Sequence, residues 1–133
     1  MSKLNYQNSC PACGAHRALE FLDLRDANVT RCARWHPPSS TPWMLTDWTN
    51  ALGGEVGELQ NVAKKLRRHE TGAVNAGDPT VEQLKAMAAD ELADVVIYAD
   101  LVAHYLGVDL GAAIRSKFNR TSEKYGFPER LHE

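Results

Sequence analysis

Two pairs of carboxylates are the residues of this sequence best suited to chemistry. Glu55 and Glu58 form the first pair, Glu91 and Asp94 form the second, and the members of each pair are three residues apart. In a helix this spacing places both members on one face. Four carboxylates that helix packing brings together would repel one another unless a divalent cation lay between them. The pattern therefore predicts a site for Mg²⁺, with Mn²⁺ as an alternative ion, and solvated acidic surfaces are the competing interpretation.

Basic residues accompany the acidic pairs. Lys65 lies seven residues after Glu58, about two helical turns, and Arg68 follows three residues later, so both return close to the acidic face. A second polar group lies further along the chain: Lys117, Asn119 and Arg120. Cations beside a metal site favour a ligand that carries phosphate. The simpler interpretations are a favourable interaction with a helix C-terminus for the first group and a solvated helix face for the second.

Three glycines surround the first acidic pair: Gly53, Gly54 and Gly57. Inside a helix each costs about 1 kcal/mol relative to alanine, so something must compensate. Close approach by another group is the usual reason. That group is either a ligand or a neighbouring helix that crosses tightly at this point.

The first acidic pair lies in a segment with the period of an amphipathic helix. Its apolar residues recur every three or four positions, which predicts a helix over about 47–69. Thr46 or Asp47 can cap the start of this helix. The following segment, 70–79, contains glycine, asparagine and proline and is predicted to be a loop.

The second acidic pair lies in another predicted helix. Thr80 and Gln83 have the capping-box pattern, and the helical period continues to Gly107, a natural left-handed stop. Asp109 can cap a further helix that ends at Gly126. These features predict two more helices, one long and one of moderate length.

One short helix is expected before the first acidic pair, ending near Trp35 because the proline-rich segment 36–42 cannot continue it. No segment alternates as a strand would. The predicted fold is all-α, with four helices whose apolar stripes pack together as a bundle.

Composition limits the remaining possibilities. The chain has 133 residues, 44% of them hydrophobic, which suits one domain over 21–133 after an N-terminal extension over 1–20. A net charge of −2 gives no basic field for nonspecific nucleic-acid binding. No apolar run reaches the roughly 18 residues of a membrane span, and the first residues lack the apolar stretch of a signal peptide. We expect a cytoplasmic protein with neither a membrane nor a nucleic acid as partner.

Three segments resemble one protein family. They are 54–59 (GEVGEL), 90–98 (DELADVVIY) and 117–126 (KFNRTSEKYG). Together they are similar to the all-α nucleoside triphosphate pyrophosphohydrolases of the MazG type, including the dCTP pyrophosphatase branch, over about 24–128. The family motif is E-x-x-E followed by E-x-x-D, and every acidic position of it is filled here.

The resemblance implies a Mg²⁺-dependent hydrolase that converts a nucleoside triphosphate, with either ribose or deoxyribose, into its monophosphate and pyrophosphate. It implies a MazG-like four-helix bundle that assembles as a homodimer or homotetramer. The four carboxylates would bind the metal, and one of the glutamates would position or deprotonate the attacking water. The phosphate contacts would be Lys65, Arg68, Lys117 and Arg120. Simpler members have a shorter connection than the 32 residues between Glu58 and Glu91, which leaves the substrate open.

Aromatic residues near the acidic pairs are candidates to bind the nucleotide. Trp35, Trp43 and Trp48 surround the proline-rich segment, and an indole stacks on a base with about 1–3 kcal/mol. We predict that Trp43 and Trp48 contact the nucleotide, with core packing as the alternative, above all for Trp48. Tyr98 and Asn119 are implied nucleotide contacts by the resemblance.

Three cysteines and a histidine form a possible structural zinc site. The four residues are Cys10, Cys13, Cys32 and His36. The spacing of Cys10 and Cys13 is that of half a zinc knuckle, and Cys32 and His36 are one helical turn apart. The alternative is free cysteines on an N-terminal extension. Two other functions also stay open: a non-catalytic all-α oligomerisation module, and a zinc-stabilised nucleic-acid adaptor, which the near-neutral charge disfavours.

Overall fold

The computed structural model describes residues 19–132, and every regular element in this range is an α-helix. The four helices are α1 (Phe21–Trp35), α2 (Leu45–Thr71), α3 (Val81–Tyr105) and α4 (Leu110–Tyr125). The all-α prediction is confirmed for this part of the chain, including the end of the first helix at Trp35.

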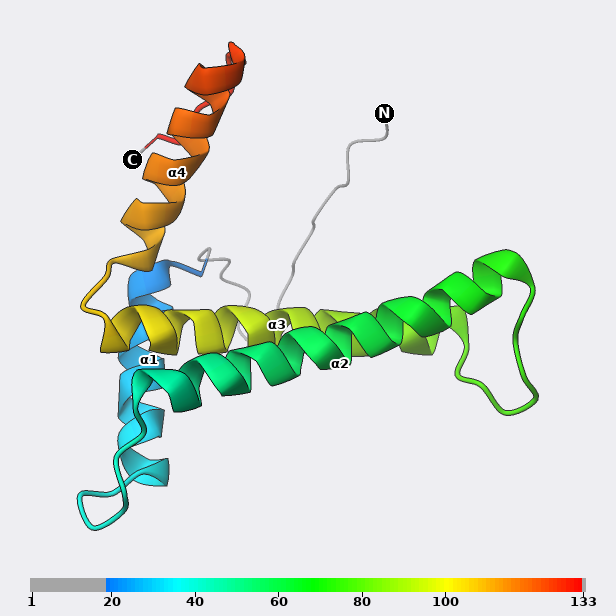
Figure 1. Cartoon of the computed structure of the whole chain (residues 1–133), viewed down its shortest axis with the longest axis horizontal. Coiled ribbons are helices and arrows are strands. Elements are labelled where there is room, and N and C mark those ends of the chain that lie inside the picture. Colours follow the sequence, from blue (N-terminus) through cyan, green and yellow to red (C-terminus); the bar gives the residue numbers. More distant parts are fainter. Residues whose placement is uncertain (1–18, 133) are drawn as a thin grey trace, which may run out of the picture.

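The long helices α2 and α3 lie side by side and run antiparallel (Figure 1). Helix α2 begins at Leu45, earlier than predicted, because the Asp47 carboxylate accepts a hydrogen bond from the Met44 backbone N–H at 2.8 Å. Asp47 therefore caps the helix from its first turn. The helix also ends later than predicted, at Thr71, where Gly72 adopts a left-handed φ of 73°.

The predicted ends of α3 and α4 are confirmed. The Gln83 backbone N–H donates to Thr80 Oγ1 at 3.2 Å, and the Thr80 N–H donates to Gln83 Oε1 at 2.8 Å. The left-handed Gly107 follows α3, and Asp109 caps α4 by accepting from the Ala112 N–H at 2.9 Å. Gly126, with φ 70°, ends α4.

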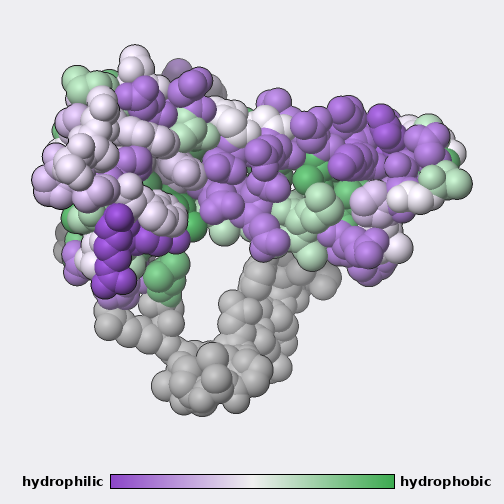
Figure 2. Space-filling view, turned by 90° about the horizontal axis from the view of Figure 1, so that it is seen from below, coloured by the Kyte–Doolittle hydropathy of each residue, from purple (hydrophilic) through white to green (hydrophobic). Residues whose placement is uncertain are grey.

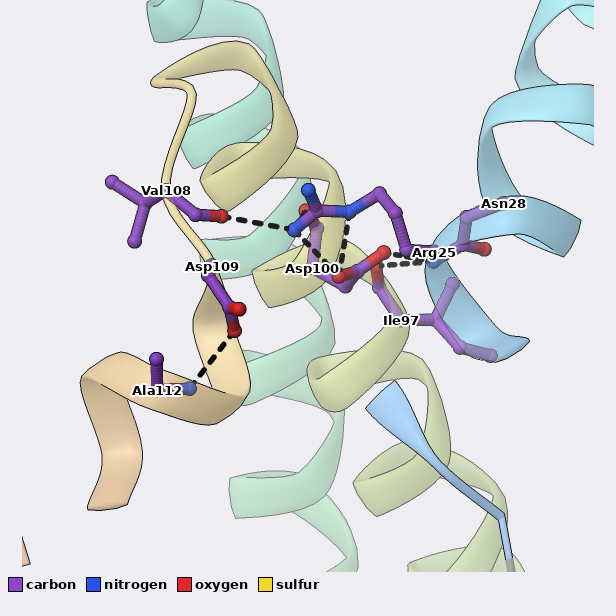
Figure 3. Close-up of polar contacts among 7 residues, drawn as sticks. All are labelled: Arg25, Asn28, Ile97, Asp100, Val108, Asp109 and Ala112. Carbon is purple, nitrogen blue, oxygen red and sulfur yellow. Dashed lines mark hydrogen bonds and ion pairs between the residues drawn. The ribbon is translucent and has the colours of Figure 1, made fainter. Parts of the chain in front are cut away.

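Helix α1 crosses one end of the α2–α3 pair and is held to α3 by a buried polar network (Figures 1 and 3). Asp100 of α3 is fully buried, and its carboxylate accepts hydrogen bonds from Arg25 Nε at 2.9 Å and Asn28 Nδ2 at 3.0 Å. Arg25 also donates to the Val108 carbonyl at 3.2 Å, in the turn between α3 and α4. The network thus ties α1 to both α3 and the turn that follows it.

Helix α4 does not pack along the α2–α3 pair. It leaves α3 across a bend of 102° and projects away from the other helices (Figure 1). Residues 19–132 of one chain thus form a two-helix pair crossed by α1, and α4 does not pack with them into the predicted bundle of four helices. The turn residues specify where α3 ends and α4 begins, but not the direction in which α4 leaves.

The core of the described chain is correspondingly thin. Its buried apolar residues are Trp48, Val62, Leu84, Leu101 and Ala103. Seen from below, hydrophobic residues reach the surface between hydrophilic ones (Figure 2). On α4 the exposed apolar residues Ile114, Phe118 and Tyr125 recur at helical spacing and share one face.

Within residues 19–132, no single helix combines the length and hydropathy of a membrane span. Helices α3 and α4 meet that standard only when they are taken together across their bend.

Candidate metal centre and adjoining cavity

The two acidic pairs converge where α2 and α3 lie side by side. Carboxylate oxygens of Glu55, Glu91 and Asp94 all lie within 4.8 Å of one another, and the three residues are half-buried. Glu58 is more exposed and lies close enough to Glu91 for its charge to raise the pKa of that residue. The antiparallel arrangement therefore brings all four predicted carboxylates into one acidic cluster.

The cluster opposes the ionisation of its own members. Desolvation raises the pKa of Glu55, and the negative charges of Asp94, Glu58 and Glu91 raise it further. Desolvation also raises the pKa of Glu91, followed by the charges of Glu58, Asp94 and Asp90 and by the hydrogen bond with Glu58. Within residues 19–132, no lysine or arginine forms an ion pair with these carboxylates.

The donor set fits a hard divalent cation. Mg²⁺ takes oxygen ligands in octahedral geometry and commonly combines a few carboxylates with water and phosphate oxygens. Glu55, Glu91 and Asp94 supply three such oxygens close together, and their partial exposure leaves access for water and a ligand. A cation would also relieve the repulsion that the raised pKa values of Glu55 and Glu91 report.

A cavity of about 150 Å³ adjoins the acidic cluster. Glu55 and Asp94 of the cluster are among its lining residues. The other lining residues are Arg31 and Trp35 from α1 and Ile97, Tyr98 and Leu101 from α3. The structure thus places Tyr98 beside the carboxylates, in a cavity whose lining combines charged, aromatic and aliphatic side chains.

Nothing in the sequence singles out Arg31, yet it lines this cavity with its guanidinium over the Trp35 ring, 4.8 Å from the ring centroid. Their separation of four residues is the spacing at which side chains meet on a helix, and it is the signal that a sequence search could use. Trp35 is 60% exposed. It is therefore open to a ligand, unlike a tryptophan in the core.

The predicted nucleotide contacts Trp43 and Trp48 lie in a separate aromatic cluster. Their ring centroids are 4.6 Å apart, and the His36 ring lies 4.7 Å from Trp43 and 5.6 Å from Trp48. Trp48 is 9% exposed and belongs to the core. Neither tryptophan is among the residues that line the cavity beside Glu55.

The predicted phosphate contacts lie in two places. Lys65 and Arg68 are half-buried on α2, about two turns and one turn short of its C-terminal end respectively. Lys117 and Arg120 lie on the projecting helix α4, where Arg120 Nη1 donates to Ser116 Oγ at 2.6 Å. Within one chain, α4 stands apart from the α2–α3 pair that carries the acidic cluster (Figure 1).

Asn119 is engaged with the segment that follows α4. Its Nδ2 donates to the Leu131 carbonyl at 3.0 Å, and its Oδ1 accepts from the Leu131 backbone N–H at 2.8 Å. Arg115 Nε adds a hydrogen bond to the His132 carbonyl at 3.3 Å. These contacts hold the chain after Pro128 against α4, and both ends of the Asn119 amide are used.

The possible zinc site falls largely outside the described residues, since Cys10 and Cys13 precede residue 19. Cys32 is half-buried, and desolvation raises the pKa of its thiol. The backbone N–H of His36 donates to the Cys32 carbonyl at 2.9 Å, while the imidazole packs against Trp43 and Trp48. In residues 19–132, the acidic cluster is the one group of side chains close enough together to hold a metal ion.

Comparison of the chain with known families and proteins gave no match. No protein-family model matches the sequence, and no curated protein matches it.

Proposed function

We propose that this chain is a Mg²⁺-dependent nucleoside triphosphate pyrophosphohydrolase. One observation carries the proposal: carboxylates from two antiparallel helices converge within 4.8 Å, at the edge of a cavity whose lining includes Trp35 and Tyr98. The cluster suits the metal-bound phosphates of a nucleotide, and the cavity suits its base. The similarity of segments 54–59, 90–98 and 117–126 to the MazG type supports the same conclusion.

In the proposed reaction, water attacks the α-phosphorus and the bond between that phosphorus and the bridging oxygen to the β-phosphate breaks. The products are a nucleoside monophosphate and pyrophosphate. Mg²⁺, when bound, neutralises phosphate charge and lowers the pKa of water. Glu55, Glu58, Glu91 and Asp94 would hold it. A glutamate of the cluster would accept the proton of the attacking water.

The proposal includes assembly as a homodimer or homotetramer. Ile114, Phe118 and Tyr125 are exposed on one face of α4, and a second copy would bury them. Packing of α4 against a second copy would complete the bundle that a single chain does not form. It would also allow Lys117 and Arg120 of one copy to reach phosphates bound by another. The proposal also includes a cytoplasmic location, where the enzyme would meet soluble nucleotides.

Product analysis tests the reaction most directly. We expect the protein to convert ribo- and deoxynucleoside triphosphates into monophosphate and pyrophosphate with Mg²⁺, and to lose this activity in EDTA. Release of diphosphate and phosphate would instead indicate a different bond cleavage. Absence of turnover with every triphosphate would favour the non-catalytic oligomerisation module, and stoichiometric zinc in the purified protein would favour the nucleic-acid adaptor.

Two substitutions in the acidic cluster test the role of the carboxylates. Asp94→Asn and Glu58→Gln each remove a negative charge at nearly constant volume, so we expect turnover to fall by a factor of about 100 or more while circular dichroism stays unchanged. Glu82→Gln makes the same chemical change on an exposed position of α3 and serves as the control. Full activity in both cluster variants would overturn the metal-site assignment.

A further inference from the structure

A chain of polar contacts leads from the buried core to the cavity beside the acidic cluster. It begins at Asp100, which is 0% exposed, and continues to Asn28, which is 2% exposed. Asn28 Nδ2 donates to Asp100 Oδ2 at 3.0 Å and to the Ile97 carbonyl at 3.2 Å. Figure 3 shows Arg25 and Asn28 reaching from α1 to Asp100 on α3.

These contacts fix the orientation of the Asn28 amide. Both acceptors on α3 require a donor, so the NH₂ group of Asn28 must face α3. Its oxygen then faces the other way, where Arg31 Nη2 donates to Asn28 Oδ1 at 3.2 Å. The buried Asp100 carboxylate thus determines, through Asn28, where the Arg31 guanidinium is held.

Arg31 keeps donors for a ligand. A guanidinium has five N–H donors, and the contact with Asn28 uses one of them. The group lies over the Trp35 ring and lines the same cavity as Glu55 and Asp94. The remaining walls at Ile97 and Leu101 are apolar and suit a flat ring rather than a phosphate group.

We propose that Arg31 selects the base of the nucleotide and that Asn28 positions the guanidinium of Arg31. The inference rests on the proposed function. The guanidinium fork pairs with two neighbouring acceptors. Cytosine presents such a pair at O2 and N3, and guanine presents one at O6 and N7. Adenine and thymine instead place a donor beside each acceptor on the edges that a guanidinium would contact. Arg31 therefore favours cytosine and guanine nucleotides.

Binding of the four deoxynucleoside monophosphates, measured by calorimetry with Mg²⁺, tests this inference without requiring turnover. We expect dCMP and dGMP to bind about 5- to 100-fold more tightly than dAMP and dTMP, the range that one bidentate pair supplies. Arg31→Met should reduce this ratio to near one. Arg31→Lys should not restore it, because an ammonium group lacks the planar fork. Arg34→Met, the same change three residues later on α1, should keep the ratio.

Asn28→Ala should lower the same ratio, because it frees Arg31 from its position. If Asn28 had only a structural role, the substitution would lower the melting temperature but would leave the ratio of monophosphate affinities unchanged in the folded protein. An equal affinity for the four monophosphates in the unsubstituted protein, or an unchanged ratio in Arg31→Met, would overturn the inference. Failure to hydrolyse any triphosphate would overturn the proposed function instead, while the binding ratios would still decide the role of Arg31.

Discussion

Glu55 and Glu91 are the residues whose ionisation the acidic cluster opposes. Both lie half-buried among other carboxylates, and no cation of residues 19–132 is paired with them. Desolvation and like charges raise the pKa of each above its ordinary value of 4.5. In the unfolded chain the same groups ionise without this opposition, so the cluster links folding to both pH and metal.

This linkage predicts how the metal-free protein responds to pH. The protonated forms of Glu55 and Glu91 are favoured in the folded state, because folding raises the pKa of both groups. Their contribution to the free energy of unfolding is therefore complete below pH 4.5 and is lost as the pH rises through the raised pKa values. We therefore expect the contribution of the cluster to the free energy of unfolding, measured by urea in EDTA, to decline from about pH 4.5 toward neutrality. Mg²⁺ at neutral pH should reverse the decline, since it binds the folded state.

Glu91→Gln provides the comparison for this prediction, because an amide carries no charge for the neighbouring carboxylates to repel. The variant should lose less stability than the unsubstituted protein over the same pH range in EDTA, and Mg²⁺ should stabilise it less. Identical pH profiles for the two proteins would show that the charges do not interact in solution.

At the residue scale, the sequence predicts the acidic cluster well and the rest of the cavity poorly. Residues three apart on one helix share a face whatever the surroundings. A correct helix assignment was therefore enough to predict that the members of each acidic pair lie together. The positions of Arg31 and Trp35 depend on where α1 crosses α3, which no local pattern specifies. The sequence did favour Trp48 as the tryptophan most suited to the core, and its 9% exposure agrees, but nothing in the sequence identified Trp35 as the tryptophan of the cavity.

At the scale of elements, the three glycines of α2 are unusual. A Cβ atom added to Gly53, Gly54 or Gly57 would meet nothing within 4 Å in the described chain. A tight helix crossing within residues 19–132 of one chain therefore does not explain these glycines. The group that compensates for their cost to the helix is then a ligand or a second copy of the chain. Each remains a cost to the helix of about 1 kcal/mol.

Alanine at these glycines should therefore stabilise the isolated chain. Gly54→Ala should raise the free energy of unfolding by about 0.5–1 kcal/mol, measured by urea in dilute, metal-free solution. Gly72→Ala is the matched control with the opposite sign, because Gly72 has a left-handed φ of 73° that alanine adopts only with strain. Destabilisation by Gly54→Ala would mean that another group already packs against this glycine.

The attachment of α1 to α3 depends on the buried pair of Arg25 and Asp100, whose closest atoms are 2.9 Å apart. Arg25→Met leaves a buried carboxylate without its cation and should cost roughly 3–5 kcal/mol in urea unfolding. Adding Asp100→Leu should recover part of that loss by removing the unpaired charge. The exposed pair of Arg67 and Glu70 offers a control, since Arg67→Met should cost less than about 1 kcal/mol.

Helix boundaries were largely predictable because capping is local. The capping box at Thr80 and the stop at Gly107 are recognisable from neighbouring residues alone. The start of α2 was misplaced because Asp47 can cap either as the first residue before a helix or as the third residue within it. The 102° bend before α4 depends on backbone angles of a short turn, which sequence patterns leave open.

At the scale of the whole molecule, the projecting helix α4 is the feature that most requires a partner. Phe118 is 43% exposed and Ile114 is 41% exposed, on a helix that makes little contact with the others. Burial of such side chains contributes about 1.5–3 kcal/mol each. The exposed face therefore favours the homodimer or homotetramer included in the proposed function.

A charge on the exposed apolar face of α4 should prevent assembly. We expect Phe118→Glu to convert the dimer or tetramer into monomer in analytical ultracentrifugation, because the interface would have to bury a carboxylate. Ser116→Glu adds the same charge on the opposite face of α4 and should leave the assembly intact. A monomeric unsubstituted protein at high concentration would contradict the proposed assembly.

The contact between Asn119 and Leu131 has a consequence for any ligand that uses this asparagine. The amide already makes two hydrogen bonds to the main chain of Leu131, so an incoming phosphate or base must first displace the segment around this residue. A competitor carried in the same chain is present at a constant effective concentration, however dilute the protein. The apparent affinity for the ligand would equal the intrinsic affinity multiplied by the fraction of time during which Asn119 is released, so the segment around Leu131 would inhibit binding competitively.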